Sequence, residues 1–273
     1  MEAGVDFGSS LTKAVWNEHG FHQYSSTADC PLKKIAYSMA QANVTQINVA
    51  GIGYTSERVK EFAVYGMKVK TFEGDPIQNE IRLQAQGVRQ LLGVKYQGKE
   101  FLLVSVGTGT SYTIVKENNF SRLPMGSPLG GGYINGWGNI LGAQNYAELV
   151  AEATKGISLD LRVKDLIPEK AGSFEGELVV ANFCKATAGA SKQDIYATLI
   201  GNVATATIQG IMDYSINPAF PIPEDVVYIG STVSHTPLLK ELLASYSLMI
   251  GKTPHFPKQG EFALALGAIL SED

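Results

Sequence analysis

The sequence contains few of the residues that stabilise disulfide-rich proteins or hold zinc. Only two of its 273 residues are cysteine, and Cys30 and Cys184 lie far apart without metal-ligand spacing. Neither a disulfide framework nor a zinc site is therefore expected. The chain has four histidines, which show no catalytic or metal-binding pairing and which we assign to surface or loop positions: His19, His22, His235 and His255.

Basic runs and targeting segments are also missing. The formal net charge is −4, and no stretch of five or more Lys and Arg residues occurs, which argues against a nucleic-acid-binding surface. The N-terminal residues MEAGVDFG have neither a basic segment nor a long apolar one, so no secretory signal is predicted. The uncharged run 123–147 is too rich in Gly, Asn and Pro for a membrane span, and run 197–212 contains Thr, Asn and Gln. We therefore expect a cytoplasmic protein that binds neither nucleic acid nor membranes.

The chain is long enough for one large domain or two of ordinary size, and 45% of its residues are hydrophobic. Three strand patterns open the chain, and strand and helix patterns then alternate, which predicts an α/β protein with a mixed sheet. The polar segment 93–100 is a plausible crossing between two halves. Expected strands lie within 2–17 (two strands) and at 21–27, 46–50, 67–72, 101–106, 111–115 and 225–229. Expected helices lie at 31–41, 56–65, 76–92, 134–155, near 178–185, and at 193–216, 237–246 and 262–270.

The stretch Phe101–Gly142 is the one around which the rest of the chain is organised. An apolar run, Phe101–Val106, meets Gly107-Thr108-Gly109-Thr110, and a second strand pattern begins at Ser111. This order predicts a tight hairpin whose glycines adopt positive φ angles. The free N–H groups of the turn and its hydroxyl groups would suit phosphate oxygens.

A triple glycine follows the hairpin. Gly130, Gly131 and Gly132 precede a predicted helix, whose unpaired N–H groups and dipole favour an anion. Residues 123–147 hold 7 of the chain's 29 glycines and no charged side chain, whereas a solvated loop usually carries charge. The alternative is that these are ordinary hairpin and loop glycines. The local density favours phosphate or nucleotide binding.

Two further regions contain candidate functional residues. Asp6 ends the first apolar run, Gly8-Ser9-Ser10 forms a turn, and Lys13 lies in the next strand, so Asp6 could hold Mg²⁺ through water and Lys13 could contact a phosphate. The alternative makes Asp6 a turn residue and Lys13 an exposed strand residue. Glu80 stands near the start of the helix predicted at 76–92. A carboxylate at that position could serve only to complement the helix dipole.

Taken in order, DFGSSLTK, VGTGTS and VYIGS resemble the two phosphate segments and the adenosine segment of the actin, Hsp70 and sugar-kinase superfamily. Within that superfamily, NEIRLQAQG, VSVGTGTS, ELVVANF and an arginine shortly before a triple glycine are similar to the type II pantothenate kinases. The arginine corresponds to Arg122, and the segment LPMGSPL that follows it has one extra residue. The spacing of Glu80 and Gly87 also matches the family.

The resemblance implies two ribonuclease-H-like (actin-like ATPase) domains, 1–95 and 96–273, with ATP in the cleft between them. The final helix, 261–272, would pack back on the first domain. It further implies transfer of the γ-phosphoryl group of ATP to the primary hydroxyl of pantothenate, which gives 4'-phosphopantothenate in the first step of coenzyme A biosynthesis. A homodimer is expected as well, because the family is dimeric and the helix at 193–216 is apolar around most of its circumference. The alternatives are a kinase of another small alcohol, such as an amino sugar, and a non-catalytic nucleotide or coenzyme A binding protein.

The resemblance also assigns roles to individual residues. Asp6 would hold Mg²⁺ through water, Glu80 would be the general base, and Arg122 would bind substrate or neutralise charge. Thr108 and Ser111 would contact pantothenate together with Arg122. Glu73 and Asp75 are rival bases. The residues expected to bind ATP are Asp6, Gly8, Ser9, Ser10, Lys13, Gly107, Thr108, Gly109, Thr110, Gly130, Gly131, Gly132, Gly230 and Ser231.

Overall fold

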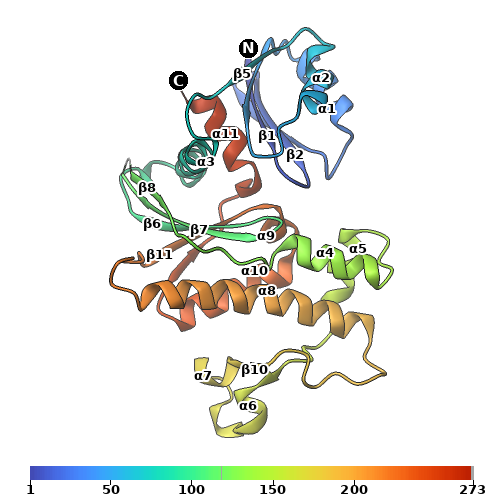
Figure 1. The fold of residues 1–273 in the computed structure, drawn as a ribbon, viewed down its shortest axis with the longest axis vertical. Coiled ribbons are helices and arrows are strands. Elements are labelled where there is room, and N and C mark those ends of the chain that lie inside the picture. The colour runs from blue at the N-terminus through green and yellow to red at the C-terminus, as the bar shows by residue number, and fades with distance from the viewer. Residues whose placement is uncertain (118, 272–273) are drawn as a thin grey trace. The chain divides into compact units, whose positions relative to one another are not determined.

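The computed structural model describes residues 1–117 and 119–271, which form two compact units. Unit 1 comprises Met1–Lys99, Val115–Ser121 and Pro257–Asp273, and unit 2 comprises Glu100–Ile114 and Arg122–Phe256. One five-stranded mixed sheet with helices lies in unit 1, and a second lies mainly in unit 2, with the part of its strands within Val115–Ser121 assigned to unit 1 (Figure 1). The predicted α/β fold class is therefore confirmed.

The sheet of unit 1 has the strand order β3-β2-β1-β4-β5. β1 pairs antiparallel with β2 and β2 with β3, whereas β4 runs parallel to β1 and β5 runs parallel to β4. The strands are β1 (Glu2–Phe7), β2 (Thr12–Glu18), β3 (Phe21–Ser26), β4 (Gln46–Ala50) and β5 (Lys68–Thr71). The helices are α1 (Leu32–Gln41), α2 (Ser56–Ala63), α3 (Pro76–Leu92) and α11 (Ala263–Leu270), and a 3-10 turn follows α3 at Val94–Tyr96.

Both faces of this sheet are covered, because successive side chains of a strand point to opposite faces. In β2, Ala14 and Trp16 join the core formed with α1 and α2, whereas Val15 packs with residues of α11. In Figure 1, α1 and α2 lie on one side of the unit 1 sheet and α3 and α11 on the other. The first strand, which carries Asp6 at its end, is thus held from both sides.

Helix α11 packs directly against bare backbone at three glycines. A Cβ atom on Gly87 of α3 would lie 1.8 Å from the carbonyl oxygen of Ala263, and one on Gly267 would lie 1.8 Å from that of Leu83. A Cβ on Gly4 of β1 would likewise lie 1.8 Å from the Ala265 oxygen. These contacts leave no room for any side chain. Gly87 is therefore a packing residue, which explains its presence two turns after Glu80.

The sheet of unit 2 has the order β12-β11-β6-β7-β8. β11 runs parallel to both β6 and β12, and the short β6–β7 connection requires an antiparallel pair. The strands are β6 (Phe101–Val106), β7 (Thr110–Lys116), β8 (Asn119–Arg122), β11 (Asp225–Ile229) and β12 (Thr253–His255). The helices are α4 (Gly131–Ile140), α5 (Tyr146–Ala153), α8 (Lys192–Ser215), α9 (Ser231–His235) and α10 (Pro237–Met249). A small two-stranded sheet, β9 (Leu161–Arg162) with β10 (Val179–Ala181), carries α6 (Val163–Leu166) and α7 (Phe174–Glu177).

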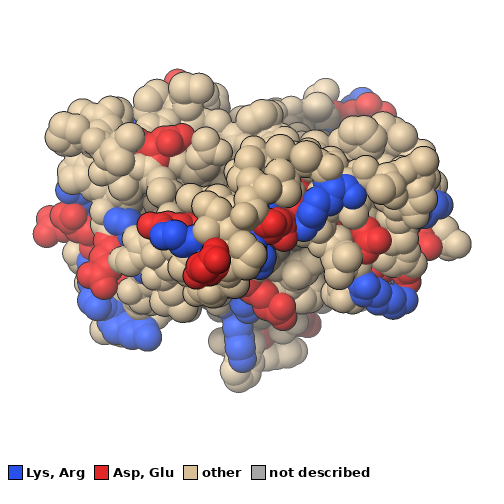
Figure 2. Space-filling model, turned by 90° about the horizontal axis from the view of Figure 1, so that it is seen from below, with Lys and Arg blue, Asp and Glu red and all other residues tan. Residues whose placement is uncertain are grey.

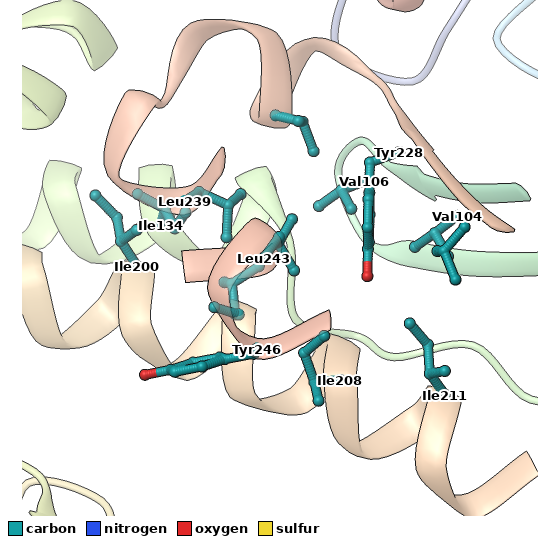
Figure 3. Packing of buried hydrophobic residues seen from close by; sticks show 14 of the residues in the cluster. Val104, Val106, Ile134, Ile200, Ile208, Ile211, Tyr228, Leu239, Leu243 and Tyr246 are labelled. Carbon is teal, nitrogen blue, oxygen red and sulfur yellow. The ribbon is translucent and has the colours of Figure 1, made fainter. Parts of the chain in front are cut away.

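Helix α8 is the central helix of the core of unit 2. Its residues Ile200, Ile208 and Ile211 pack in one cluster with strand residues such as Tyr228 and with Leu243 of α10 (Figure 3). The helix is long and apolar enough to cross a membrane, but 67% of its most apolar window is buried inside the structure. A core helix passes the same test of length and composition, and the packing accounts for its apolar character.

Two predicted helices are wrong. The single helix expected at 134–155 is two helices, α4 and α5, because Gly142 has φ +75° and Asn145 caps the second by accepting the N–H of Glu148 at 2.9 Å. The helix expected near 178–185 is strand β10 followed by a turn with Phe183 at φ 57°. The short elements β8, β9, β12 and α9 had no clear pattern in the sequence.

Candidate active site

The first candidate phosphate segment is the turn between β1 and β2. Asp6 and Lys13 are directly paired in the strand register, and the Lys13 ammonium lies 3.0 Å from Asp6 Oδ2. The two side chains are only 8% and 12% exposed, so this is a buried ion pair. The N–H of Gly8 donates to the Leu11 carbonyl at 3.0 Å and closes the turn, while Ser9 and Ser10 are exposed. Lys13 is thus neither exposed nor a lone cation, which overturns the view of it as an exposed strand residue.

A second loop, residues 51–53, packs on the end of β1. Gly51 has φ +92°, and a Cβ there would lie 2.6 Å from Asp6 Oδ1. The N–H of Gly53 donates to the Phe7 carbonyl at 2.7 Å, and Arg58 of α2 donates to the Gly8 and Gly53 carbonyls. Gly51, Gly53 and Arg58 were not assigned to the site from the sequence. A pair of glycines directly after a strand was the available signal.

The second candidate phosphate segment is the β6–β7 turn. Its glycines do not have positive φ angles, contrary to prediction, and the N–H of Gly107 donates to the Gly109 carbonyl at 2.9 Å. At Gly109 a Cβ would lie 3.0 Å from the Ser127 carbonyl oxygen, a tight contact that a small shift of the loop would have to relieve. A Cβ on Gly107 would meet nothing within 4 Å among the described residues. Nothing in the described structure therefore requires glycine at 107, because a Cβ atom there would have open space around it.

The triple glycine positions α4 against this turn. The N–H groups of Gly131 and Gly132 donate to the carbonyls of Gly107 and Thr108 at 2.7 and 2.9 Å. The prediction treated the first N–H groups of this helix as unpaired, and for these two residues it is wrong. A Cβ on Gly130 would lie 2.7 Å from the Thr108 carbonyl, so the glycines allow close approach of backbone to backbone.

The candidate adenosine segment joins the same cluster. Gly230 follows β11 with φ +105°, and a Cβ there would lie 2.4 Å from the Val106 carbonyl. Ser231 begins α9, and the hydroxyl of Thr232 donates to the Gly107 carbonyl at 2.8 Å. Segments 107–110, 130–132 and 230–232 therefore lie together in unit 2, although they are far apart in the sequence.

The candidate substrate residues Thr108, Ser111 and Arg122 belong to the β6–β7–β8 region. Thr108 and Arg122 are exposed and Ser111 is half-buried. The buried hydroxyl of Thr110, in contrast, donates to the Leu129 carbonyl at 2.9 Å and anchors the loop after Arg122. Residues 110 and 127 also exchange two backbone hydrogen bonds of 2.9 Å, so the loop with the extra residue is held at this point.

Glu80 is half-buried on α3 in unit 1. Its rival Asp75 is the N-cap of that helix and accepts the N–H of Gln78 at 2.8 Å. Asp75 therefore has a capping role that accounts for its position. Glu73 is exposed and precedes the helix. Among the rival carboxylates, only Glu80 lies on the helix itself.

Asp160 in unit 2 had no role in the sequence-based site. It is fully buried, and burial raises the pKa of its carboxyl group. Its Oδ1 accepts the N–H of Phe183 at 2.9 Å, and the Asn202 amide donates to Oδ2 at 2.9 Å once its oxygen and nitrogen are exchanged, the orientation that satisfies both atoms. Asp160 thus fixes the end of the ELVVANF segment. That segment and α8 line a cavity of about 310 Å³, formed by Leu129, Val179, Val180, Ala181, Asn182, Asn202, Thr205, Ala206 and Gln209.

Comparison with known proteins supports the family resemblance that the sequence motifs predicted. A type II pantothenate kinase of Staphylococcus saprophyticus is 28% identical over 98% of this chain and 99% of its own length. One of Bacillus cereus is 30% identical over 98% of this chain and 96% of its own. Component A of the (R)-2-hydroxyglutaryl-CoA dehydratase of Acidaminococcus fermentans has a similar structure, with a TM-score of 0.61, 16% identity, and coverage of 98% and 96%. At that identity the structural match shows the fold alone.

The family model described as Fumble matches residues 92–270. This range includes the β6–β7 turn, Arg122, the triple glycine, the ELVVANF segment and the Gly230 turn. The resemblance predicted from the motifs is confirmed. The chain therefore belongs to the Fumble family, alongside the type II pantothenate kinases that it resembles over nearly its whole length.

Proposed function

We propose that this protein is an ATP-dependent kinase that phosphorylates the primary hydroxyl of pantothenate and forms 4'-phosphopantothenate. The observation that carries the proposal is the clustering of segments 107–110, 130–132 and 230–232 in a chain whose relatives are named type II pantothenate kinases. The buried Asp6–Lys13 pair beside the turn of residues 8–10 would supply the other phosphate segment that such an enzyme needs. The product would enter coenzyme A biosynthesis.

On the nucleotide side, Lys13 and the turns at 8–10 and 107–110 would contact the phosphates, and Gly230 and Ser231 would contact the adenosine. Asp6 suits magnesium, since Mg²⁺ beside substrate phosphates keeps several waters and is held by only one or two carboxylates. Lys13 is bonded to Oδ2 of Asp6. Oδ1 lies beside Gly51, and a side chain at that position would collide with it, because a Cβ would lie 2.6 Å away. Magnesium, when bound with ATP, would neutralise charge on the transferring group.

On the acceptor side, Glu80 would accept the proton of the pantothenate hydroxyl. The hydroxyl oxygen would then bond to the γ-phosphorus of ATP, and ADP would leave. Arg122 would neutralise charge or bind substrate, and Thr108 and Ser111 would hold the acceptor. Phosphoryl transfer depends on positioning and charge neutralisation more than on covalent chemistry, so one carboxylate is sufficient as base. The exposed position of Arg122 is compatible with a contact to an entering substrate.

We further propose an N-terminal domain at 1–95 and a C-terminal domain at 96–273 whose final helix packs back on the first domain, together with a cytoplasmic location and a homodimer. The grouping of Pro257–Asp273 with unit 1 supports that place for the final helix. Helix α8 is already largely buried in unit 2, so its apolar character alone does not require a second chain. The dimer therefore rests on the family resemblance, and light scattering that gave the single-chain mass of 29.3 kDa would refute it.

On the face drawn in Figure 2, the described Lys and Arg residues are interspersed with Asp and Glu residues, which gives no support for nucleic-acid binding.

A coupled assay of ADP release with Mg-ATP tests the function. Pantothenate should give turnover well above the rate without acceptor, and a panel of amino sugars should not. Turnover with an amino sugar and none with pantothenate would favour a sugar kinase of the same fold. Nucleotide binding without turnover on either class would favour a non-catalytic binding protein.

A further inference from the structure

Arg58 of α2 joins the first phosphate turn to the neighbouring loop of residues 51–53. Its Nη1 atom donates to the Gly8 carbonyl at 2.9 Å and to the Gly53 carbonyl at 2.8 Å. Its guanidinium group also lies over the ring of Phe7, 5.5 Å from the centroid. Arg58 is half-buried, and Thr55 caps the helix by accepting the Arg58 N–H at 3.3 Å. One charged side chain is therefore bound to both loops and to the end of β1.

The surrounding backbone is packed closely enough to make this contact rigid. The Gly53 N–H donates to the Phe7 carbonyl at 2.7 Å, and a Cβ on Gly53 would lie 2.4 Å from the Gly8 oxygen. The same Cβ would lie 2.8 Å from Arg58 Nη1. Glycine at 53 is thus what lets Arg58 reach the Gly8 carbonyl.

The bond to Gly8 determines how the exposed turn presents its dipoles. In a trans peptide the C=O of one residue and the N–H of the next point in opposite directions. With the Gly8 oxygen held toward α2, the Ser9 N–H must point away from α2. A carbonyl oxygen that faced a phosphate would repel it, whereas an N–H donates to it. A hydrogen bond from a charged donor is stronger than one between neutral groups, so it can fix this orientation before any ligand binds.

We propose that Arg58 is a positioning residue for nucleotide phosphates: it holds the Gly8–Ser9 peptide so that the Ser9 N–H can donate to a phosphate oxygen. Arg58 itself acts through the turn rather than on the ligand. This inference rests on the proposed function, because it requires the turn of residues 8–10 to meet a nucleotide. It adds a residue that the motif-based site lacks.

Arg58→Met tests the proposal, because methionine keeps an apolar stem beside Phe7 and removes every donor. Dissociation constants for Mg-ATP and for adenosine would be measured by calorimetry on the full chain. We expect the constant for Mg-ATP to rise roughly tenfold to a hundredfold, as when a supporting shell of a binding site is lost, while that for adenosine stays within about twofold. Arg58→Lys, which restores a charged donor, should recover part of the affinity.

Lys60→Met is the matched control, since it removes a positive charge from an exposed position of the same helix. It should leave both constants unchanged. Equal loss for Mg-ATP and adenosine, an equal loss in the Lys60 variant, or an unchanged Mg-ATP constant in Arg58→Met would overturn the inference. Should Arg58→Met not fold, the Lys variant decides: an Mg-ATP constant at least threefold above wild type with adenosine unchanged supports the proposal, and an unchanged one overturns it. Wild-type protein that binds no Mg-ATP would instead overturn the proposed function.

Discussion

In unit 1, the turn of residues 8–10 follows the first strand of a five-stranded sheet. In unit 2, the turn of residues 107–109 follows strand β6. The two sheets have matching strand orders, β3-β2-β1-β4-β5 and β8-β7-β6-β11-β12, so β1 and β6 are the central strands of their sheets. The supports of the two turns differ. Charged side chains hold the first, through the Asp6–Lys13 pair and Arg58. Backbone bonds from Gly131 and Gly132 and the hydroxyl of Thr232 hold the second.

The difference shows two physical ways to prepare a turn for an anion. The first turn can be weakened by removing a charge, and the second by adding an atom. In the second turn, a methyl group added at Gly130 would meet the backbone of residues 107–109, whereas one added at Gly107 would meet nothing within 4 Å among the described residues. The two turns should therefore respond to different substitutions, and the predictions below separate them.

The largest effect is expected at Glu80, which belongs to neither turn. Glu80→Gln should lower turnover by roughly 10²–10⁴-fold, because the acceptor hydroxyl loses its base, while Mg-ATP binding and melting temperature barely change. Steady-state kinetics and a thermal shift with Mg-ATP measure the two properties. A variant that keeps more than about a tenth of wild-type turnover would show that Glu80 is not the base, and Asp75 would be tested next.

Asp6→Asn tests the charged support of the first turn. The variant leaves the buried Lys13 ammonium without its partner, so the free energy of unfolding should fall by about 2–4 kcal/mol. The gain in melting temperature on adding Mg-ATP should shrink as well. Urea unfolding measures the first quantity.

Glu152→Gln provides the comparison, since its ion pair with Lys155 is partly exposed, at 28% and 64%. That variant should lose less than about 1 kcal/mol. Equal losses in the two variants would mean that the first turn does not depend on a buried charge.

Gly130→Ala and Gly107→Ala form a matched pair for the second turn. The Cβ at 130 would lie 2.7 Å from backbone, so this variant should lose about 1–3 kcal/mol of stability and most of its activity. The Cβ at 107 meets nothing within 4 Å among the described residues, so that variant should keep its stability. Its Mg-ATP affinity should nevertheless fall about tenfold if phosphate occupies the open space.

The smallest effect concerns pH and the buried carboxyl of Asp160. Because burial raises its pKa above the ordinary 3.8, the folded chain holds this proton at pH values where the unfolded chain has lost it. Stability therefore falls as the pH rises above 3.8, until the folded group has ionised too. Asp160→Asn should remove this fall and change stability at pH 7 by less than about 1 kcal/mol, provided that Asn202 reorients its amide. Urea unfolding between pH 4 and pH 7 checks it, and an unchanged slope would contradict it.

The sequence was sufficient where the deciding signals are local. Helix α3 has the predicted bounds because Pro76 opens it, Asp75 caps it and Gly93 ends it. Strand β6 followed from its apolar run. Strand β10 could not be predicted in this way, because it forms by pairing with β9, seventeen residues earlier.

The candidate site shows the same limit. Glycines at 107, 109 and 130–132 were singled out from their local density, but their positive φ angles and unpaired N–H groups were inferred from turn statistics. Their actual partners, such as the Gly131 N–H bonded to the Gly107 carbonyl, are tertiary contacts. Arg58 lies fifty residues from Gly8, and nothing in the local pattern connects the two.

The three glycine contacts of α11 have a consequence for the order in which the chain can fold. Strand β1 and helix α3 leave the ribosome early, yet the helix that fits against Gly4 and Gly87 is made of residues 263–270. The cores that contain Val15 and Leu83 stay incomplete until then. All of unit 2 is synthesised in the meantime and can form its own core around α8. During synthesis, the first unit to begin is thus the last to be finished.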